Sequence, residues 1–420
     1  MVNWASDISA AYAGVRERTV DICRPLETED FVVQPMEDAS PPKWHLAHVT
    51  WFFETFVLKP HVPAYCAYND AFEVLFNSYY NGVGKPFPRP ERGRLSRPTV
   101  AEVMAYRRHV DDHMARVINA EMSAEILFRI ILGLNHEQQH QELLLTDLKY
   151  NLGRNPLYPA YIPKAPPASA AAVSLDFMEV RKGIYETGIA CPARTSGEFA
   201  FDNESPRHEV LLGDCALSTR LVTNGEYLAF MEDGAYARPE LWLSDAWSLI
   251  NKPGSGFHKP LYWVQREDGW YEYTLGGLHP LALHAPVCHV SGYEADAYAR
   301  WAGCRLPTES EWEVVAKGLA VTGNFVESGQ LHPVCAPAGD GMLQVFGDVW
   351  EWTSSSYQPY PRFRPFEGEL GEYNGKFMAI QLVLRGGSCA TPESHIRPTY
   401  RNFFYPKDRW QFTGIRLAKD

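Results

Sequence analysis

Residues Asn135–Glu142 read NHEQQHQE, and they lie within a longer stretch, 123–152, that has the apolar spacing of a single helix. His136 and His140 are four residues apart, so a helix projects both imidazoles from one face, about one turn from each other. Two imidazoles at this spacing can bind one first-row transition-metal ion. The pair predicts a metal site inside a helical domain, with a third ligand supplied from elsewhere in the chain.

The apolar surroundings of this pair distinguish it from another pair with the same spacing. Residues 126–132 (ILFRIIL) precede it and Leu143–Leu145 follow it, which predicts a helix inside a bundle. Buried imidazoles require polar partners or a metal, so a pair of hydrogen-bonded core histidines is the alternative. His109 and His113 stand among charged residues, which predicts a solvated helix face and no metal. Gln139 falls near the face of the first pair and is placed to hydrogen-bond a substrate.

The composition limits the classes of partner. The chain has 420 residues, enough for two domains, and a formal net charge of -12 without any basic run. Nucleic acid and anionic membranes are therefore not expected as partners, and small-molecule substrates are. No apolar segment approaches about 18 residues and the N-terminus lacks a signal-peptide pattern, so we expect a cytoplasmic protein. The eight cysteines form no C-x-x-C pair, which predicts reduced thiols. Nothing in the sequence specifies an oligomeric state.

The fold class that we predict is multidomain, α followed by α+β. Helical periodicity covers four stretches of an up-down bundle: 6–24, 41–58, 98–120 and 123–152. A Pro/Ala-rich segment, 163–173, predicts a linker between a helical domain, 1–162, and a second domain, 174–420. The second domain contains short β-like runs such as Glu209–Leu212 and short helices near 224–232 and 292–302. No Gly-rich phosphate loop follows a predicted strand, so a nucleotide cofactor is not implied.

Four ordered motifs of the second domain carry a family resemblance. They are Arg305–Glu313 (RLPTESEWE), Gly347–Thr353 (GDVWEWT), Leu384–Ser388 (LRGGS) and Phe412–Leu417 (FTGIRL). Together they resemble the formylglycine-generating-enzyme-like (sulfatase-modifying-factor), C-type-lectin-related fold. In the helical half, Trp44–His48 (WHLAH) and the His136/His140 motif resemble the DinB-type four-helix bundle. The combination is similar to the iron-dependent sulfoxide synthases of ergothioneine biosynthesis.

The resemblance implies an activity and a metal centre. That family uses non-haem Fe(II) and O2 to join a thiol to C2 of the imidazole of hercynine (trimethylhistidine), and it forms a sulfoxide. Carried over to this sequence, the iron ligands are His48, His136 and His140, and His45 is the less favoured member of its pair. A site of three neutral imidazoles would leave open positions for substrates and O2.

The resemblance also implies roles for two tyrosines and two arginines in the loop that follows the second helix. Tyr79 and Tyr80 resemble the active-site tyrosines of the branch that uses free cysteine, in which a tyrosine donates a proton or hydrogen. The alternative, for whichever tyrosine is not the donor, is that its side chain is an ordinary packed aromatic residue. Arg89 and Arg92 stand where the cysteine carboxylate is expected, and a planar guanidinium suits bidentate pairing with it. The alternative for both is a solvated arginine.

Near the C-terminus, Asn402-Phe403-Phe404 matches the substrate loop of the family. The resemblance implies that Asn402 contacts hercynine and that Phe403 offers an aromatic face to its quaternary ammonium. In the branch that uses γ-glutamylcysteine, an acidic residue stands at the position of Phe404. The substitution favours cysteine as the sulfur donor.

Other activities compete with this interpretation. A selenoneine-pathway synthase would have the same architecture and join hercynine to a selenosugar. A DinB-type metal-dependent thiol transferase would share the three histidines, but it would not explain the second domain. A true formylglycine-generating enzyme would need a pair of active cysteines near the C-terminus, where Cys389 stands without a nearby partner in the sequence. A lectin-like binding protein would be expected to carry a secretion signal and disulfides.

Overall fold

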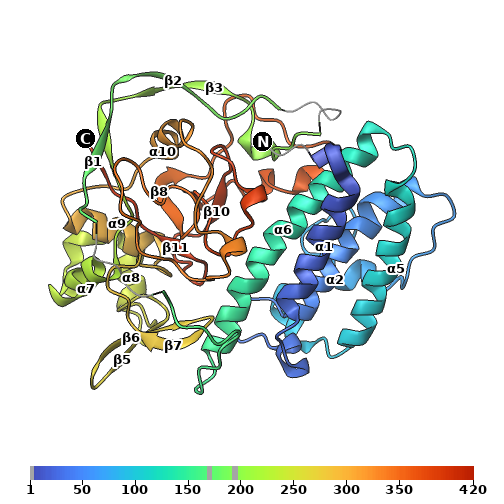
Figure 1. The fold of residues 1–420 in the computed structure, drawn as a ribbon, viewed down its shortest axis with the longest axis horizontal. Helices are drawn as coiled ribbons and strands as arrows, with labels where there is room; N and C mark the ends of the chain where they lie inside the picture. Colours follow the sequence, from blue (N-terminus) through green and yellow to red (C-terminus); the bar gives the residue numbers. More distant parts are fainter. Residues whose placement is uncertain (1–3, 168–172, 192–196) are drawn as a thin grey trace. The chain divides into compact units, whose positions relative to one another are not determined.

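The computed structural model describes residues 4–167, 173–191 and 197–420. The chain forms two compact units: a helical unit of residues 1–155, 191–202 and 364–375, and a sheet-rich unit of residues 156–190, 203–363 and 376–420 (Figure 1). Two segments from the region beyond residue 174 therefore belong to the helical unit. Residues 168–172 of the predicted linker lie outside the described part of the chain.

Four long helices make up most of the helical unit, and they confirm the four predicted stretches. They are α1 (Ile8–Cys23), α2 (Pro42–Phe53), α5 (Val100–Ile118) and α6 (Ala124–Gly153). A π-helical turn, Glu54–Leu58, extends α2. Local signals fix the starts of these helices: Pro42 occupies the first turn of α2, and the Ser123 side chain accepts a hydrogen bond from the Ile126 N–H at the start of α6. Short segments between them form α3 (Lys59–His61) and α4 (Phe72–Leu75).

A buried ionic network joins three of these helices behind the histidine motif. Glu137 on α6 is fully buried, and its carboxylate accepts hydrogen bonds from Arg16 of α1 (2.9 Å) and Arg107 of α5 (2.6 Å), and from Thr19 (2.6 Å). Burial alone would raise the pKa of Glu137, but the two guanidinium groups hold it at about 2. The network stabilises the ionised carboxylate and fixes which face of α6 points toward α2.

The described residues of the sheet-rich unit form four small sheets rather than one large one. Their strand orders are β1-β4-β12, β10-β9-β8-β11, β2-β3 and β5-β6-β7. Neighbouring strands are antiparallel except for β11 beside β8. The strands are β1 (Phe177–Val180), β2 (Gly183–Thr187), β3 (His208–Leu212), β4 (Cys215–Ser218), β5 (Trp263–Arg266), β6 (Gly269–Thr274), β7 (Gly277–Pro280), β8 (Trp350–Ser356), β9 (Leu382–Arg385), β10 (Asn402–Phe404), β11 (Thr413–Gly414) and β12 (Ala418–Lys419).

Four short helices accompany these sheets: α7 (Asn224–Glu232), α8 (Ser244–Ile250), α9 (Gly292–Trp301) and α10 (Glu309–Ala316). The predicted run at 209–212 and the predicted helices near 224–232 and 292–302 are confirmed by β3, α7 and α9. The predicted fold class, a helical domain followed by a mixed α+β domain, is therefore correct. No helix in the described part of the chain combines the length and apolarity that a membrane crossing requires.

The four sequence motifs meet in one buried network of the sheet-rich unit. Glu351 of β8 accepts hydrogen bonds from Arg416 (2.7 Å) and from the indole N–H of Trp312 (2.8 Å), and all three side chains are buried. Arg385 lies on β9, opposite Glu351 of β8 in the strand register, and its side chain donates a hydrogen bond to Glu313 (2.9 Å). Charged residues that are this deeply buried require such partners. The motifs thus specify the core of this unit and not a reactive group.

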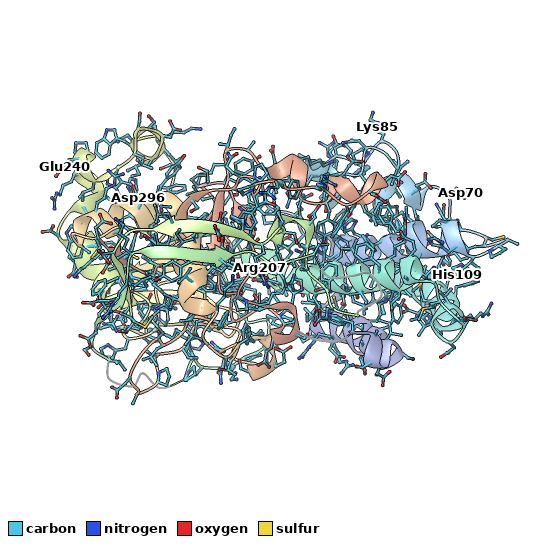
Figure 2. The ribbon with its side chains drawn as sticks, turned by 90° about the horizontal axis from the view of Figure 1, so that it is seen from above. Asp70, Lys85, His109, Arg207, Glu240 and Asp296 are labelled. Carbon is cyan, nitrogen blue, oxygen red and sulfur yellow. The ribbon has the colours of Figure 1, made fainter. Side chains whose placement is uncertain are left out.

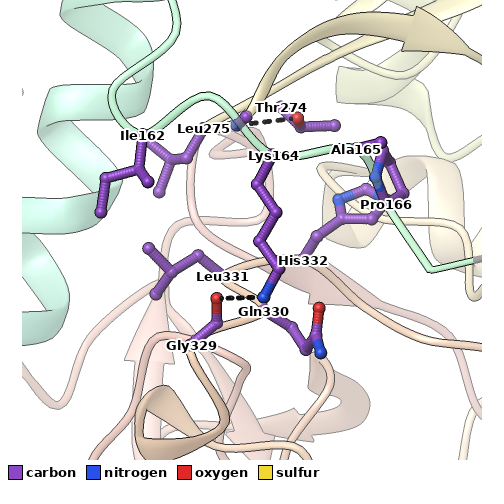
Figure 3. Close-up of a pocket in the computed structure, with 11 residues that line it drawn as sticks. Ile162, Lys164, Ala165, Pro166, Thr274, Leu275, Gly329, Gln330, Leu331 and His332 are labelled. Carbon is purple, nitrogen blue, oxygen red and sulfur yellow. Dashed lines mark hydrogen bonds between the residues drawn. The ribbon is translucent and has the colours of Figure 1, made fainter.

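The segment that follows α6 belongs to the sheet-rich unit and packs within it. The Tyr161 N–H donates to the Leu275 carbonyl (2.9 Å), and the Lys164 ammonium donates to the Gly329 carbonyl (3.0 Å). Figure 3 shows the small pocket around Lys164. Its walls include the aliphatic side chains of Ile162 and Leu331, and the Gly329 carbonyl accepts a hydrogen bond from the Lys164 ammonium. The pocket is therefore explained by the packing of residues 161–166 against the rest of the sheet-rich unit.

Candidate metal centre

The helical unit brings three histidines together. His48 of α2 and His136 and His140 of α6 each offer a ring nitrogen, and these atoms all lie within 4.8 Å of one another. The spacing of four residues places both α6 rings toward α2, as predicted from the sequence. His48 and His136 are buried and His140 is half-buried, so His140 lies on the more accessible side of the trio. This is the one group of metal-ligand type found among the described residues.

His48 is held rigidly with one nitrogen left over. Its Nδ1 lies 2.6 Å from the Phe76 carbonyl oxygen, which requires that Nδ1 carry the proton and donate. Its ring stacks on Trp44, with ring centroids 4.5 Å apart and the planes 14° from parallel, and it also stacks on Trp51, with centroids 5.6 Å apart. The Nε2 atom is buried, and no residue in the described part of the chain forms a hydrogen bond with it. His48 therefore presents a fixed lone pair toward the trio.

His136 carries the sharpest sign that a ligand belongs here. Both of its ring nitrogens are buried and find no hydrogen-bond partner among the described residues, and the side chain is 1 % exposed. Leaving a buried polar atom without a partner costs about 1–3 kcal/mol, so such an atom in a native site calls for an explanation. A metal ion bound by the trio would satisfy one nitrogen each of His48 and His136. The donor set fits a first-row transition metal.

The protonation states agree with metal binding. Burial lowers the pKa of His136 to about 3 and lowers the pKa of His48 and His140 well below the usual value. The three rings are therefore neutral near pH 7. Metal binding requires neutral imidazole, so no proton has to be removed before an ion binds.

His45 differs from His48 in its hydrogen bonding. Its Nε2 lies 3.0 Å from a carboxylate oxygen of Asp147, and its Nδ1 lies 2.9 Å from Nδ1 of His140. Both ring nitrogens are thus in use, whereas His48 keeps one nitrogen unpaired. The geometry places His45 beside the trio and not within it.

Tyr373 lies beside the trio, and the two tyrosines that the sequence pointed to, Tyr79 and Tyr80, lie next to Tyr373 and Trp51. Tyr79 and Tyr80 follow α4, and their rings stack with centroids 4.6 Å apart. Tyr373 comes from the segment 364–375, and its ring centroid lies 5.7 Å from that of His136. The Tyr373 hydroxyl donates a hydrogen bond to the side-chain oxygen of Gln139. Burial raises the pKa of Tyr79 and of Tyr80, so both hydroxyls stay protonated across the usual pH range.

The segment that carries Tyr373 is tied to the tyrosine loop. The Glu372 carboxylate accepts hydrogen bonds from the backbone N–H groups of Asn81 (3.1 Å) and Gly82 (2.7 Å). Tyr373 also stacks on Phe201, with centroids 5.3 Å apart. These contacts fix one wall of the site. No short sequence motif predicts that Tyr373 or Glu372 belongs to the site. Both residues lie there because residues 364–375 pack within the helical unit.

The two arginines of the loop differ in their surroundings. Arg92 is 3 % exposed, donates to the hydroxyls of Ser40 (2.9 Å) and Ser78 (3.0 Å), and has its guanidinium carbon 3.3 Å from the Trp44 ring centroid. It forms no ion pair with any described residue, and burial lowers its pKa because the cation is desolvated. Arg89 is exposed and donates to the Asp38 carbonyl (2.7 Å). Arg92 is thus a buried cation held next to the stacked rings of Trp44 and His48.

The predicted substrate loop belongs to the sheet-rich unit. Asn402, Phe403 and Phe404 form β10 and are each half-buried. The Phe403 ring stacks on Tyr357 with centroids 4.1 Å apart, and Phe377 lies 6.0 Å away. One face of Phe403 is therefore covered within this unit. The Asn402 side-chain oxygen accepts a hydrogen bond from the Phe403 N–H (2.9 Å).

His109 and His113 are less exposed than their charged neighbours suggested. His109, labelled in Figure 2, lies on α5, where both rings are half-buried. They pack against Tyr65 and Tyr68, and His113 is hydrogen-bonded to the His109 carbonyl (2.8 Å). The expectation of a solvated face was therefore wrong, because the aromatic loop before α4 covers this side of the helix.

Comparison with known proteins identifies both parts of the chain. Residues 174–340 and 328–420 match the sulfatase-modifying factor enzyme 1-like domain, and residues 11–144 match the DinB superfamily. A hercynine oxygenase from Mycolicibacterium smegmatis is 31 % identical over 96 % of each chain, and one from Mycobacterium tuberculosis is 32 % identical over 91 % of each. A formylglycine-generating enzyme from Streptomyces coelicolor is 30 % identical over 52 % of this chain and 82 % of its own. With its DinB-type bundle, its sulfatase-modifying-factor-like domain and nearly full-length similarity to these oxygenases, the chain belongs to the hercynine oxygenase family.

Proposed function

We propose that this protein is a non-haem Fe(II), O2-dependent sulfoxide synthase of ergothioneine biosynthesis that joins cysteine to C2 of the hercynine imidazole. The single observation that supports this most directly is the buried trio His48, His136 and His140, whose unpaired nitrogens converge in a chain of the hercynine oxygenase family. When bound, Fe(II) would supply the centre at which a thiolate and O2 react.

The reaction is balanced without a further reductant. One C–H bond and one S–H bond are lost, and one C–S bond and one S–O bond form. O2 accepts four electrons, two from carbon and two from sulfur. Its first oxygen enters the sulfoxide and its second leaves as water with the two protons.

We assign the cysteine carboxylate to Arg92, with Arg89 as a weaker contributor. Arg92 is a buried cation that lacks an ion-pair partner among the described residues, and an incoming carboxylate would offset that desolvation. A charge-assisted hydrogen bond of this kind contributes about 1.5–3 kcal/mol. Arg89 lies in the same loop but is exposed, so solvent screens its charge.

The remaining residues have proposed roles at the two reacting partners. Tyr79 and Tyr80 hold a protonated hydroxyl pair that can deliver a proton, and Gln139 is placed to orient a substrate or a tyrosine through its amide. Asn402 and Phe403 are proposed to contact hercynine, and Phe404 to disfavour a γ-glutamyl group because it offers no polar partner.

The test is anaerobic reconstitution with Fe(II), followed by O2, with hercynine and one sulfur or selenium donor in each reaction. Cysteine, γ-glutamylcysteine and a selenosugar are compared, and mass spectrometry identifies the products. We expect hercynyl-cysteine sulfoxide as the main product, and His136→Ala serves as the inactive control. Selenium transfer alone would assign the protein to selenoneine formation, and transfer of a thiol without C–S bond formation at the imidazole would favour a DinB-type thiol transferase. No hercynine adduct with any donor would refute the proposal.

A further inference from the structure

We infer that Asp147 and His45 form a relay of two hydrogen bonds that positions His140 as a metal ligand. The inference rests on the proposed function, because it concerns a ligand of the proposed metal. It assigns His45 and Asp147 as positioning residues, since neither would touch the metal or a substrate.

The three residues form a continuous line within the helical unit. His140 and Asp147 are seven residues apart on α6, which is two turns, so both side chains leave the same face of the helix. His45 lies on α2, the helix against which that face packs. The distances along the line are 3.0 Å from Asp147 Oδ2 to His45 Nε2 and 2.9 Å from His45 Nδ1 to His140 Nδ1.

The direction of the hydrogen bonds follows from the acceptor at one end. The Asp147 Oδ2 atom accepts the Ser40 N–H as well, so it acts as an acceptor, and His45 Nε2 carries a proton and donates it. A neutral His45 then has a bare lone pair on Nδ1, which accepts the Nδ1 proton of His140. That tautomer of His140 leaves its Nε2 lone pair for a metal. The alternative tautomer, with the His140 proton on Nε2, would block that ring as a ligand.

The relay resembles the way in which His48 is fixed on another side of the site. His48 donates from Nδ1 to the Phe76 carbonyl, which also leaves Nε2 for a metal. His140 lacks a backbone carbonyl in this role among its hydrogen-bond partners and uses an imidazole instead. Outer hydrogen bonds of this kind set ring orientation and ligand basicity, and their loss commonly weakens metal affinity 10- to 100-fold.

Asp147 is itself held in place and buried. It is 2 % exposed, and its Oδ2 accepts a hydrogen bond from the Ser40 N–H (2.7 Å) just before α2. The carboxylate therefore adds one fixed negative charge behind the trio of neutral rings. A divalent cation in the trio would be stabilised by that charge, because little solvent intervenes to screen it.

The test measures metal affinity of the full chain with Co(II), by competition with a chelator, together with the visible spectrum of the Co(II) protein. His45→Leu removes the relay, His45→Gln keeps one acceptor and one donor, and Asp147→Asn removes only the charge. His113→Leu is the matched control, since it deletes a hydrogen-bonded histidine of the same unit away from the trio. The melting temperature of each metal-free variant reports whether the fold is retained.

We expect His45→Leu to weaken Co(II) binding about 10- to 100-fold and to alter the Co(II) spectrum. Asp147→Asn should weaken Co(II) binding by a smaller factor. The Co(II) affinities of His45→Gln and His113→Leu should stay within about threefold of that of the original protein. Wild-type affinity and spectrum in a folded His45→Leu protein would overturn the relay. If His45→Leu does not fold, unchanged affinity in Asp147→Asn would overturn it. If His136→Ala also binds Co(II) as tightly as the original protein, the assignment of the three metal ligands is wrong, which is a result separate from the test of the relay.

Discussion

The rings of His136 and Tyr373 contact each other edge to face, with centroids 5.7 Å apart, although the two residues come from opposite halves of the sequence. The segment 364–375 leaves the sheet-rich unit, packs within the helical unit and places Tyr373 on Phe201, beside the histidine trio. The helical half of the sequence therefore supplies all three candidate metal ligands but not the whole wall around them. A substrate bound near His136 would contact the phenol ring of Tyr373, a residue that no sequence motif near the histidines predicts.

The ligand assignment predicts that His136→Ala loses the metal. His136 has no hydrogen-bond partner within residues 4–167, 173–191 and 197–420, and two imidazoles alone make a weak and incomplete site. Fe(II) or Co(II) affinity should therefore fall by about 100-fold or more. His109→Ala, a histidine of α5 outside the trio, should bind the metal normally. Anaerobic metal titration of both variants decides the point. Metal retention by His136→Ala, or its loss from His109→Ala, contradicts the assignment.

The tyrosine assignment predicts a change of product and not only of rate. Tyr80→Phe removes a buried hydroxyl while keeping the ring, so the product ratio should shift from sulfoxide toward oxidised thiol without loss of metal. Mass spectrometry of the reaction with cysteine and hercynine measures the ratio. Tyr373→Phe is the informative comparison because its ring lies next to His136. If only Tyr373→Phe changes the ratio, the donor is Tyr373 and the prediction for Tyr80 is wrong.

The carboxylate assignment predicts a selective effect on one substrate. Arg92→Met should raise the KM for cysteine about 10- to 100-fold, as expected for the loss of one charge-assisted hydrogen bond, and change the KM for hercynine little. Arg89→Met should have an effect below about threefold, because its guanidinium is exposed. Arg92 also stacks on Trp44, so metal affinity is measured in parallel to separate substrate binding from a disturbed site. Equal increases in both KM values would contradict the assignment.

Much of the helical unit was predictable because its signals are local. The period of apolar residues located all four long helices, and i,i+4 spacing placed His136 and His140 on one face. The third histidine required more than spacing, since His45 and His48 lie on the same helix three residues apart. The structure separates them by their hydrogen bonds, which a sequence does not encode locally.

The parts that the sequence did not reveal depend on contacts between distant segments. Tyr373 and Glu372 sit in a loop that reads as ordinary polar sequence, and their position follows from the packing of that loop beside the Tyr79–Tyr80 segment. The half-buried state of His109 has a similar cause, since Tyr65 and Tyr68 cover a helix face whose own residues look solvated. In both cases the partner is set by tertiary structure.

The buried carboxyl of Asp348 predicts a measurable dependence of stability on pH. Asp348 lies in the GDVWEW motif, is 3 % exposed and has a left-handed φ of +55°. Burial raises its pKa to about 6, although hydrogen bonds from the Val334 N–H (2.9 Å) and Asn324 (2.7 Å) favour the ionised form. Because the folded pKa exceeds the usual unfolded value of about 3.9, the folded state binds the proton more tightly. Stability should therefore fall as the pH rises from about 4 through about 6.

Asp348→Asn should remove that dependence, because asparagine stays neutral and tolerates the left-handed backbone. Its side-chain oxygen accepts the hydrogen bonds from Val334 and Asn324, and only the long one from Gln344 to the other carboxylate oxygen (3.4 Å) is lost. Above pH 7 we expect the variant to be more stable than the original by on the order of 2 kcal/mol, and near pH 4 the two should converge. Urea denaturation followed by tryptophan fluorescence between pH 4 and pH 8 measures the difference. Asp340→Asn, an exposed carboxyl in the same region, is the control and should follow the original profile. Parallel profiles for Asp348→Asn and the original would show that the Asp348 carboxyl is ionised in the folded protein at no cost, so that its hydrogen bonds fully offset its burial.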